Sequence, residues 1–312
     1  MNHNLTDDEF LARWNIWCGF LRDGEDSNAI HNQLNNLYWS IGVYKAKNIS
    51  WGQGKIDNAA TAPLFFDYYL QTFAVFLVVN IRKILEEGVL INNNTTSPDR
   101  SVISLSSILK DIRFQRQEFT RRRIFLANEI VYDEEQIKIK HEAYSSEKRR
   151  NGENFFSVPR KFWAHATCYL HEQWDSLSGT TKSQRTEDDI ITEERFERLG
   201  KQIIKIRKEI ETFANKFILH AATPMSRLAK KGYNEETFEG PSITRLIEIS
   251  LECGSMYGEL CDFLSLGRMN PLPYAQFDKW EGWDPTMYAD RTVLEDTWNK
   301  WEDAIKAAVG AS

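Results

Sequence analysis

Apolar residues recur at intervals of three and four residues along most of the chain, which is the spacing of amphipathic helices. In residues 6–21, Thr6 precedes Glu9 by three positions, a capping-box signature, and Phe10, Trp14 and Trp17 follow at helical spacing. No segment shows the period-two alternation of a β-strand, and no internal repeat occurs. The pattern therefore predicts an all-α, multi-helix bundle.

The most regular apolar stripe ends at a histidine. Its members are separated by three, four, three, four and three residues: Ile203, Ile206, Ile210, Phe213, Phe217 and His220. Pro224 follows and cannot continue a helix. This stripe predicts a long amphipathic helix that ends at His220.

Similar patterns predict further helices over residues 64–87, 104–112, 159–178, 242–266 and 291–309. Aromatic residues on nearly every side of the 64–87 helix predict that it lies at the centre of the bundle. Small residues at Gly254, Ser255 and Gly258 would let a neighbouring backbone come close to the 242–266 helix.

Three segments interrupt the helical pattern. Glycine, asparagine and lysine in residues 42–61 predict a loop or linker, and the polar residues 143–153 predict a flexible excursion. The proline-rich and aromatic residues 269–285 predict an ordered loop packed on the bundle. The resulting organisation is an N-terminal helical segment with linker (1–60), a helical core (61–229) and a C-terminal helical extension (230–312), or one domain containing all three.

Charge and composition favour a soluble, cytoplasmic protein. The net charge of −6 is unlike that of a protein that coats nucleic acid, so any nucleic-acid site must be a local basic patch. Two such clusters, residues 121–123 and 148–150, are predicted to be solvated helix or loop charges. The polar start lacks a secretory signal, and the apolar stretch at 68–79 is too short to span a bilayer. The scattered cysteines Cys18, Cys168, Cys253 and Cys261 are predicted to be reduced core residues.

The familiar cofactor and metal motifs are missing from the sequence. It contains no phosphate-binding glycine loop, nucleophile elbow, HExxH or paired Cys/His zinc spacing. The sequence therefore predicts neither a cofactor nor a metal site, and the candidate chemistry rests on histidines in helices.

His220 is the first candidate, because it is the polar member of an apolar stripe at the C-terminal end of its helix. There the helix dipole favours a protonated imidazole. Lys216 lies one turn earlier, so a proton-carrying imidazole would sit beside a fixed ammonium, which suits attack on a phosphodiester. The alternative is that His220 is an ordinary core histidine hydrogen-bonded within the bundle.

A second candidate pair is Arg160 and His165, which are separated by four residues at the start of a predicted helix. Their side chains could meet across its first turn. The spacing alone is not specific, since six histidines should give about one such pair by chance.

The order of these features resembles the HEPN superfamily, and within it the group associated with bacterial abortive infection. The resemblance covers residues 64–227 and is carried by IRKIL at 81–85, SLSSIL at 104–109, WDSLSG at 174–179 and, most specifically, FANKFILHA at 213–221. It implies an HEPN-like core with helical additions at both ends. Many HEPN proteins are dimeric, metal-independent endoribonucleases whose motif is an arginine, commonly a polar residue after it, and a histidine four to six residues beyond the arginine.

Carried onto this chain, the motif's polar position falls on Asn215, its histidine on His220 and its arginine position on Ala214. Lys216 could supply charge in place of that arginine, without the bidentate fork of a guanidinium. Arg160 and His165 keep the literal motif earlier in the chain.

The resemblance implies an endoribonuclease, or an effector derived from one, acting in antiviral defence or with an antitoxin. It implies a cytoplasmic homodimer with an RNA substrate, a possible regulatory protein partner and no membrane association. The alternative is a catalytically inactive helical module that binds a protein or nucleotide, which the alanine at position 214 would allow.

Overall fold

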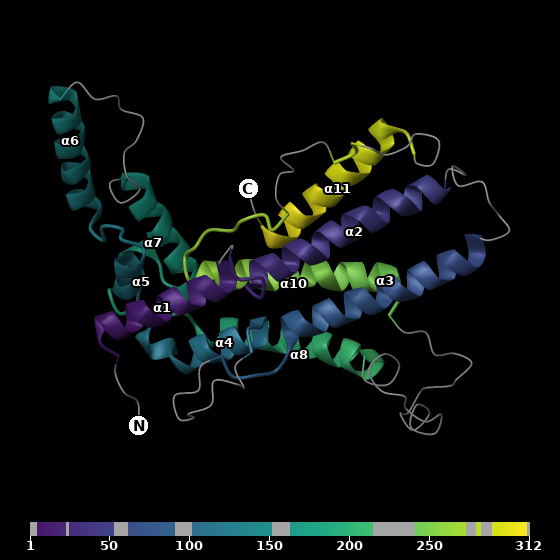
Figure 1. The fold of residues 1–312 in the computed structure, drawn as a ribbon. Coiled ribbons are helices and arrows are strands. Elements are labelled where there is room, and N and C mark those ends of the chain that lie inside the picture. Colours follow the sequence, from purple (N-terminus) through teal and green to yellow (C-terminus); the bar gives the residue numbers. More distant parts are fainter. Residues whose placement is uncertain are drawn as a thin grey trace.

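The computed structural model of the chain describes residues 5–22, 25–52, 62–90, 102–151, 163–214, 241–272, 279–281 and 289–310. Its helices are α1 (Asp7–Arg22), α2 (Ile30–Gly52), α3 (Ala62–Leu85), α4 (Leu105–Phe114), α5 (Arg121–Ala127), α6 (Glu134–Arg150), α7 (Ala164–Ser178), α8 (Glu193–Phe213), α10 (Ile243–Phe263) and α11 (Arg291–Val309). The described residues form no β-strand, and an isolated bridge pairs Thr120 with Ile190. The predicted all-α fold is confirmed (Figure 1).

Helix α10 lies at the centre of the bundle, where it packs against α2, α3, α4, α8 and α11 (Figure 1). The predicted close approach is confirmed, because a side chain at Gly254 would collide with Tyr38 of α2, and one at Gly258 with the backbone of Val309 in α11. Ser242 begins the helix by accepting a hydrogen bond from the Arg245 backbone N–H at 3.1 Å. Small residues thus allow neighbouring helices to approach α10 closely.

Polar caps define other helix starts as the sequence predicts. Thr6 and Glu9 form the predicted capping box before α1. Ser104 caps α4 through the backbone N–H of Ser107, and the apolar face of α4 is buried, including Ile108 and Ile112. These signals are local, so they are readable without tertiary information.

The predicted stripe on α8 is confirmed as far as the structure describes it. Ile203, Ile206 and Ile210 are almost fully buried, and so is Ala214 at the end of the helix. The last part of the predicted helix, through His220, lies outside the described residues.

Two predicted breaks in helical structure are wrong. Helix α2 continues through residues 42–52, because Gly42 lies against the ring of Trp298 and serves a close contact instead of ending the helix. Residues 53–61 of the predicted loop lie outside the described residues. Helix α6 continues to Arg150, since Asp133 caps its start and acidic and basic residues at its two ends complement the helix dipole. Residues 152 and 153 of the predicted excursion lie outside the described residues.

The predicted central position of the helix at 64–87 is also wrong. Tyr68, Val75 and Val79 of α3 are 68%, 39% and 44% exposed. Toward α2, Phe73 of α3 is buried and stacks on Tyr44 with ring centroids 4.3 Å apart. By length and composition, Tyr68–Leu85 could cross a membrane, although a core helix can pass the same test and 33% of this window is buried.

One hydrophobic cluster includes residues from all three predicted segments of the chain, for example Phe10, Leu77 and Leu246. The partly described 269–285 segment contributes Leu272 and Trp280 to it. The proposed domain boundaries stay a prediction.

Candidate functional site

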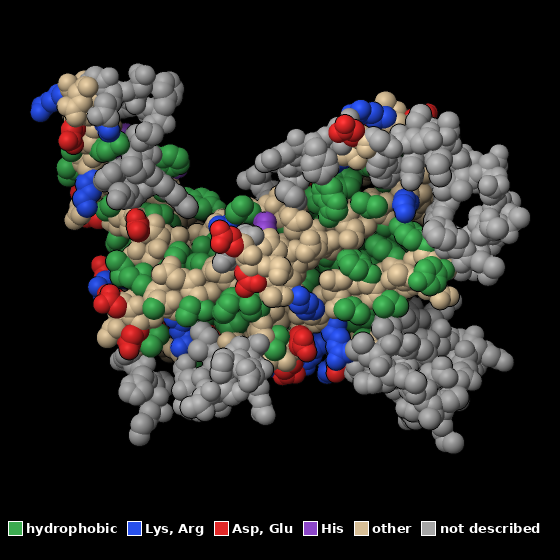
Figure 2. Space-filling view, in the orientation of Figure 1, with side chains coloured by type: hydrophobic (Ala, Val, Ile, Leu, Met, Phe, Trp, Pro, Cys, Tyr) green, Lys and Arg blue, Asp and Glu red, His purple; other side chains and the backbone are tan. Residues whose placement is uncertain are grey.

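Helices α6 and α7 form an arm that projects from the body of the bundle (Figure 1). The two helices pack against each other, and α6 ends in Lys148, Arg149 and Arg150 at the free end of the arm. Figure 2 shows Lys and Arg side chains at this end. The predicted solvation of this basic cluster agrees with the exposure of Arg149 and Arg150.

Of the five predicted site residues, the structure describes only His165. Arg160, Asn215, Lys216 and His220 lie outside the described residues, so the structure brings none of them together with His165. These roles stay predictions.

His165 is exposed in the first turn of α7. Its ring stacks on that of Trp163, with centroids 4.9 Å apart and planes inclined by 29°. Trp163 is itself 39% exposed, and Tyr169, one turn after His165, is 56% exposed. An imidazole available to solvent therefore lies on a short aromatic strip, a surface on which nucleic-acid bases can stack.

The same side of α7 leads into an open groove of about 520 Å³. Tyr169, Gln173 and Ser176 of α7 line it, together with Arg195 of α8 and Arg268 after α10. Arg195 donates to the Ser176 backbone carbonyl at 2.6 Å and to the Ser176 hydroxyl at 3.0 Å, and no carboxylate among the described residues pairs with it.

The second guanidinium of the groove is already neutralised. Arg268 Nε donates to both carboxylate oxygens of Asp262 at 3.0 Å, and this bonding raises the pKa of Arg268. Glu172 and Asp262 add negative charge to the groove wall. Arg195 is thus the groove arginine with donor capacity left for an anionic group.

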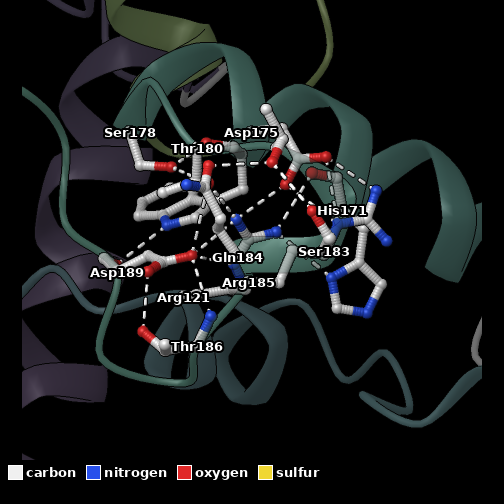
Figure 3. Close-up of polar contacts among 12 residues, drawn as sticks. Arg121, His171, Asp175, Ser178, Thr180, Ser183, Gln184, Arg185, Thr186 and Asp189 are labelled. Atoms are coloured by element: carbon white, nitrogen blue, oxygen red, sulfur yellow. Dashed lines mark hydrogen bonds and ion pairs between the residues drawn. The ribbon is translucent and has the colours of Figure 1, made fainter.

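A second polar site, at the base of the arm, centres on Arg121 (Figure 3). This guanidinium begins α5 and is fully buried. Its Nη2 donates to Asp175 at 2.8 Å, to Asp189 at 2.8 Å and to the Thr180 hydroxyl at 2.9 Å. The prediction that residues 121–123 are solvated is wrong for Arg121, because burial of two carboxylates requires a cation between them. It is also wrong for Arg123, whose side chain is 16% exposed and pairs with Asp7 and Glu118, and it holds for Arg122, which is 59% exposed.

His171 of α7 completes the buried set. Its Nε2 lies 2.9 Å from the Tyr132 carbonyl oxygen, which can only accept, so Nε2 carries the proton. Its Nδ1 then accepts from Arg121 Nη1 at 3.3 Å. Burial is the main cause that lowers the pKa of His171, and the neighbouring Arg185 and Arg121 lower it further. His171 is therefore neutral in this arrangement.

Arg185 extends the network to α6. It donates through Nε and Nη2 to Asp175, at 2.7 Å for the closest pair, and through Nη1 to Glu134 at 3.1 Å. Burial works to raise the pKa of Asp175, but hydrogen bonds from Arg185 and Arg121 outweigh it, so that pKa lies below its ordinary value. For Asp189, bonds from Thr186 and Arg121 likewise outweigh burial, and its pKa is lowered.

We call Arg121, His171, Asp175, Arg185 and Asp189 the Arg121 network. Within the Arg121 network, donors and acceptors that face one another are hydrogen-bonded. In the described structure the network therefore holds helices together. A sequence signal for it exists, since Arg121 shares a helical face with the buried Ile124 and Phe125.

Metal and thiol chemistry find little support in the described part of the chain. It contains no group of three or more His, Cys, Asp or Glu side chains that could hold a metal ion. All four cysteines are free; Cys253 and Cys261 are buried, and burial raises the pKa of the Cys261 thiol to about 11.

Comparisons with protein-family models, with curated proteins and with solved structures found no match. The resemblance to the HEPN superfamily therefore stays a prediction from the sequence.

Proposed function

We propose that the chain binds single-stranded RNA along the exposed side of α7 and cleaves it as an HEPN-like, metal-independent endoribonuclease, with His165 moving protons. The observation that carries this proposal is the exposed imidazole of His165 stacked on the exposed ring of Trp163. The other histidine of α7, His171, is buried and hydrogen-bonded through both ring nitrogens.

Binding would use the chemistry of the α7 surface. Unpaired RNA bases stack on aromatic side chains, and Trp163 and Tyr169 both present exposed rings. Arg195 would contact a phosphate through the donors it does not use on Ser176.

Cleavage would be a transesterification within the RNA. The ribose 2′-hydroxyl gives up its proton to His165 and attacks the adjacent phosphorus, and the bond to the 5′ oxygen of the next nucleotide breaks. The leaving oxygen takes up a proton from water, His165 returns the proton it accepted to solvent, and the products carry a 2′,3′-cyclic phosphate and a 5′-hydroxyl. Arg160, five positions before His165, would stabilise charge on the phosphate.

The test is cleavage of an unstructured RNA oligonucleotide with a chelator present, using wild type, His165→Ala and His220→Ala. We expect wild type to cleave, His165→Ala to lose about 100-fold or more in rate, and His220→Ala to retain cleavage. Trp163→Ala should weaken RNA binding while leaving the fold intact.

Cleavage by His165→Ala at the wild-type rate would remove His165 from this role. If His220→Ala alone abolished cleavage, the site would instead be His220 with Lys216 and Asn215. A homodimer and a defence or antitoxin context belong to the same proposal.

The second candidate function is a binding module without catalysis. It is favoured by the paired charges of the groove, where Arg268 is bound to Asp262 beside Glu172, an arrangement better suited to a partner protein of mixed charge than to a polyanion. Intact RNA after incubation with wild-type protein, together with loss of a protein partner on Tyr169→Ala, would support this function.

A further inference from the structure

The Arg121 network and Glu134, which accepts a hydrogen bond from Arg185, join four parts of the chain at the base of the arm. Arg121 belongs to α5, Glu134 to the first turn of α6, His171 and Asp175 to α7, and Asp189 to the loop that precedes α8. In Figure 3 the side chains of His171, Asp175 and Asp189 lie around the guanidinium of Arg121. The attachment of the arm to the body therefore includes a buried set of ionisable groups.

His171 is 4% exposed, and its ring packs against two aromatic rings. Its ring lies 4.4 Å from that of Phe125 in α5 and 4.9 Å from that of Tyr132, measured between centroids. The charged groups that act on it are Arg121 from α5, Arg185 from the loop after α7 and Glu134 from α6.

This arrangement offers no hydrogen-bond acceptor for a second proton on His171. The proton would sit on Nδ1, which now accepts from Arg121 Nη1 at 3.3 Å, so a hydrogen bond would become a contact between two cations. The nearby carboxylates cannot compensate without giving up existing bonds, because Asp175 binds Arg121 and Arg185, and Glu134 binds Arg185.

We propose that protonation of His171 breaks its contact with Arg121 and loosens the arm formed by α6 and the first half of α7, so that the arm responds to mild acidification. This inference depends on the contacts of His171 with its neighbours, and it holds whether or not His165 cleaves RNA.

The direction of the response follows from the lowered pKa of His171. The open or unfolded form takes up a proton near the ordinary value of about 6.5, whereas the closed form resists it. The closed arm therefore loses stability as pH falls below that value. Asp175 and Asp189 stay ionised there, because their pKa values are lowered from 3.8.

The test is amide hydrogen exchange of the full chain at about pH 7 and about pH 5, expressed relative to the intrinsic rate at each pH. We expect protection in residues 134–150 and 164–171 to fall about tenfold in wild type, since one proton can shift such an equilibrium by at most about tenfold per pH unit. His171→Gln should show no such fall, because glutamine can accept from Arg121 and donate to the Tyr132 carbonyl without titrating.

His31→Gln is the matched control. Burial also lowers the pKa of His31, which hydrogen-bonds Tyr257 in the body of the bundle, so this variant should keep the wild-type response of the arm. A fall in protection that persists in His171→Gln, or no fall in wild type, would overturn the proposal. If His171→Gln does not fold, the titration of His171 in wild type followed by NMR decides, and a pKa at or above about 6.5 would count against the proposal.

Discussion

The N-terminal end and the middle of α7 carry histidines six residues apart in opposite surroundings. His165, in the first turn, is exposed and touches the ring of Trp163. His171 is 4% exposed and bonded to Arg121 and to the Tyr132 carbonyl. Both are polar members of one amphipathic helix, and their separation along the sequence does not distinguish them.

The contrast shows that hydrogen-bond partners decide which histidine is available for chemistry. A buried imidazole with both nitrogens engaged cannot accept a proton from a substrate without disrupting its neighbours. An exposed imidazole can accept that proton, and its protonation changes the free energy of unfolding little. The N-terminal end of α7 is thus suited to function and its middle to stability.

The largest expected effect is in the buried Arg121 network. Arg121→Met should lower the free energy of unfolding by about 3–5 kcal/mol, because Asp175 and Asp189 would be left without their shared cation. Urea denaturation at neutral pH measures this loss. The control is Arg122→Met, whose side chain is 59% exposed and pairs with Asp7 at the surface, and which should cost less than about 1 kcal/mol. Equal losses from the two variants would contradict a structural role for the network.

The effect of intermediate size is the dependence of the free energy of unfolding on pH. Because the pKa of His171 is lowered in the folded protein, the unfolded chain binds more protons below about pH 6.5, and stability should decrease as pH falls. The slope from this single group can reach about 1.4 kcal/mol per pH unit. Urea denaturation at several pH values between about pH 7 and pH 5 should show that the free energy of unfolding falls less steeply with decreasing pH for His171→Gln than for wild type. The same pH dependence in both proteins would show that His171 is not its cause.

The smallest expected effect is at the exposed end. His165→Ala and Trp163→Ala should each change the free energy of unfolding by less than about 0.5 kcal/mol, since neither side chain is buried. Thermal unfolding of both variants provides the measurement. A loss as large as that of Arg121→Met would show that the exposed end is structural too, and would weaken the proposed site.

Features that depend on local sequence could be predicted well. The capping box of Thr6 and Glu9 and the apolar stripe of α8 follow from short-range rules, and the small residues Gly254 and Gly258 mark where other helices come close. Gly42 shows the limit of these rules. A glycine that reads as a helix break is a contact point for Trp298, more than 200 residues away in the chain.

The candidate site could be predicted only in part. His165 is a candidate from its spacing to Arg160, but its stacking on Trp163 and the groove beyond Tyr169 depend on tertiary structure. The Arg121 network was missed because its carboxylates lie more than 50 residues along the chain from Arg121. Three adjacent arginines are typical of a solvated surface, and only the buried neighbours of Arg121 distinguish it from Arg122.

The central position of α10 affects how the protein folds during synthesis. Tyr38 of α2 donates to the Ser250 carbonyl at 3.0 Å, and Trp301 of α11 donates to the Tyr38 carbonyl at 2.9 Å. The apolar side of α2 that faces α10 and α11 therefore stays uncovered until those two helices have been made. Such long-range contacts slow folding and expose apolar surface on the nascent chain. We expect the emerging chain to depend on chaperones until its last helices are available.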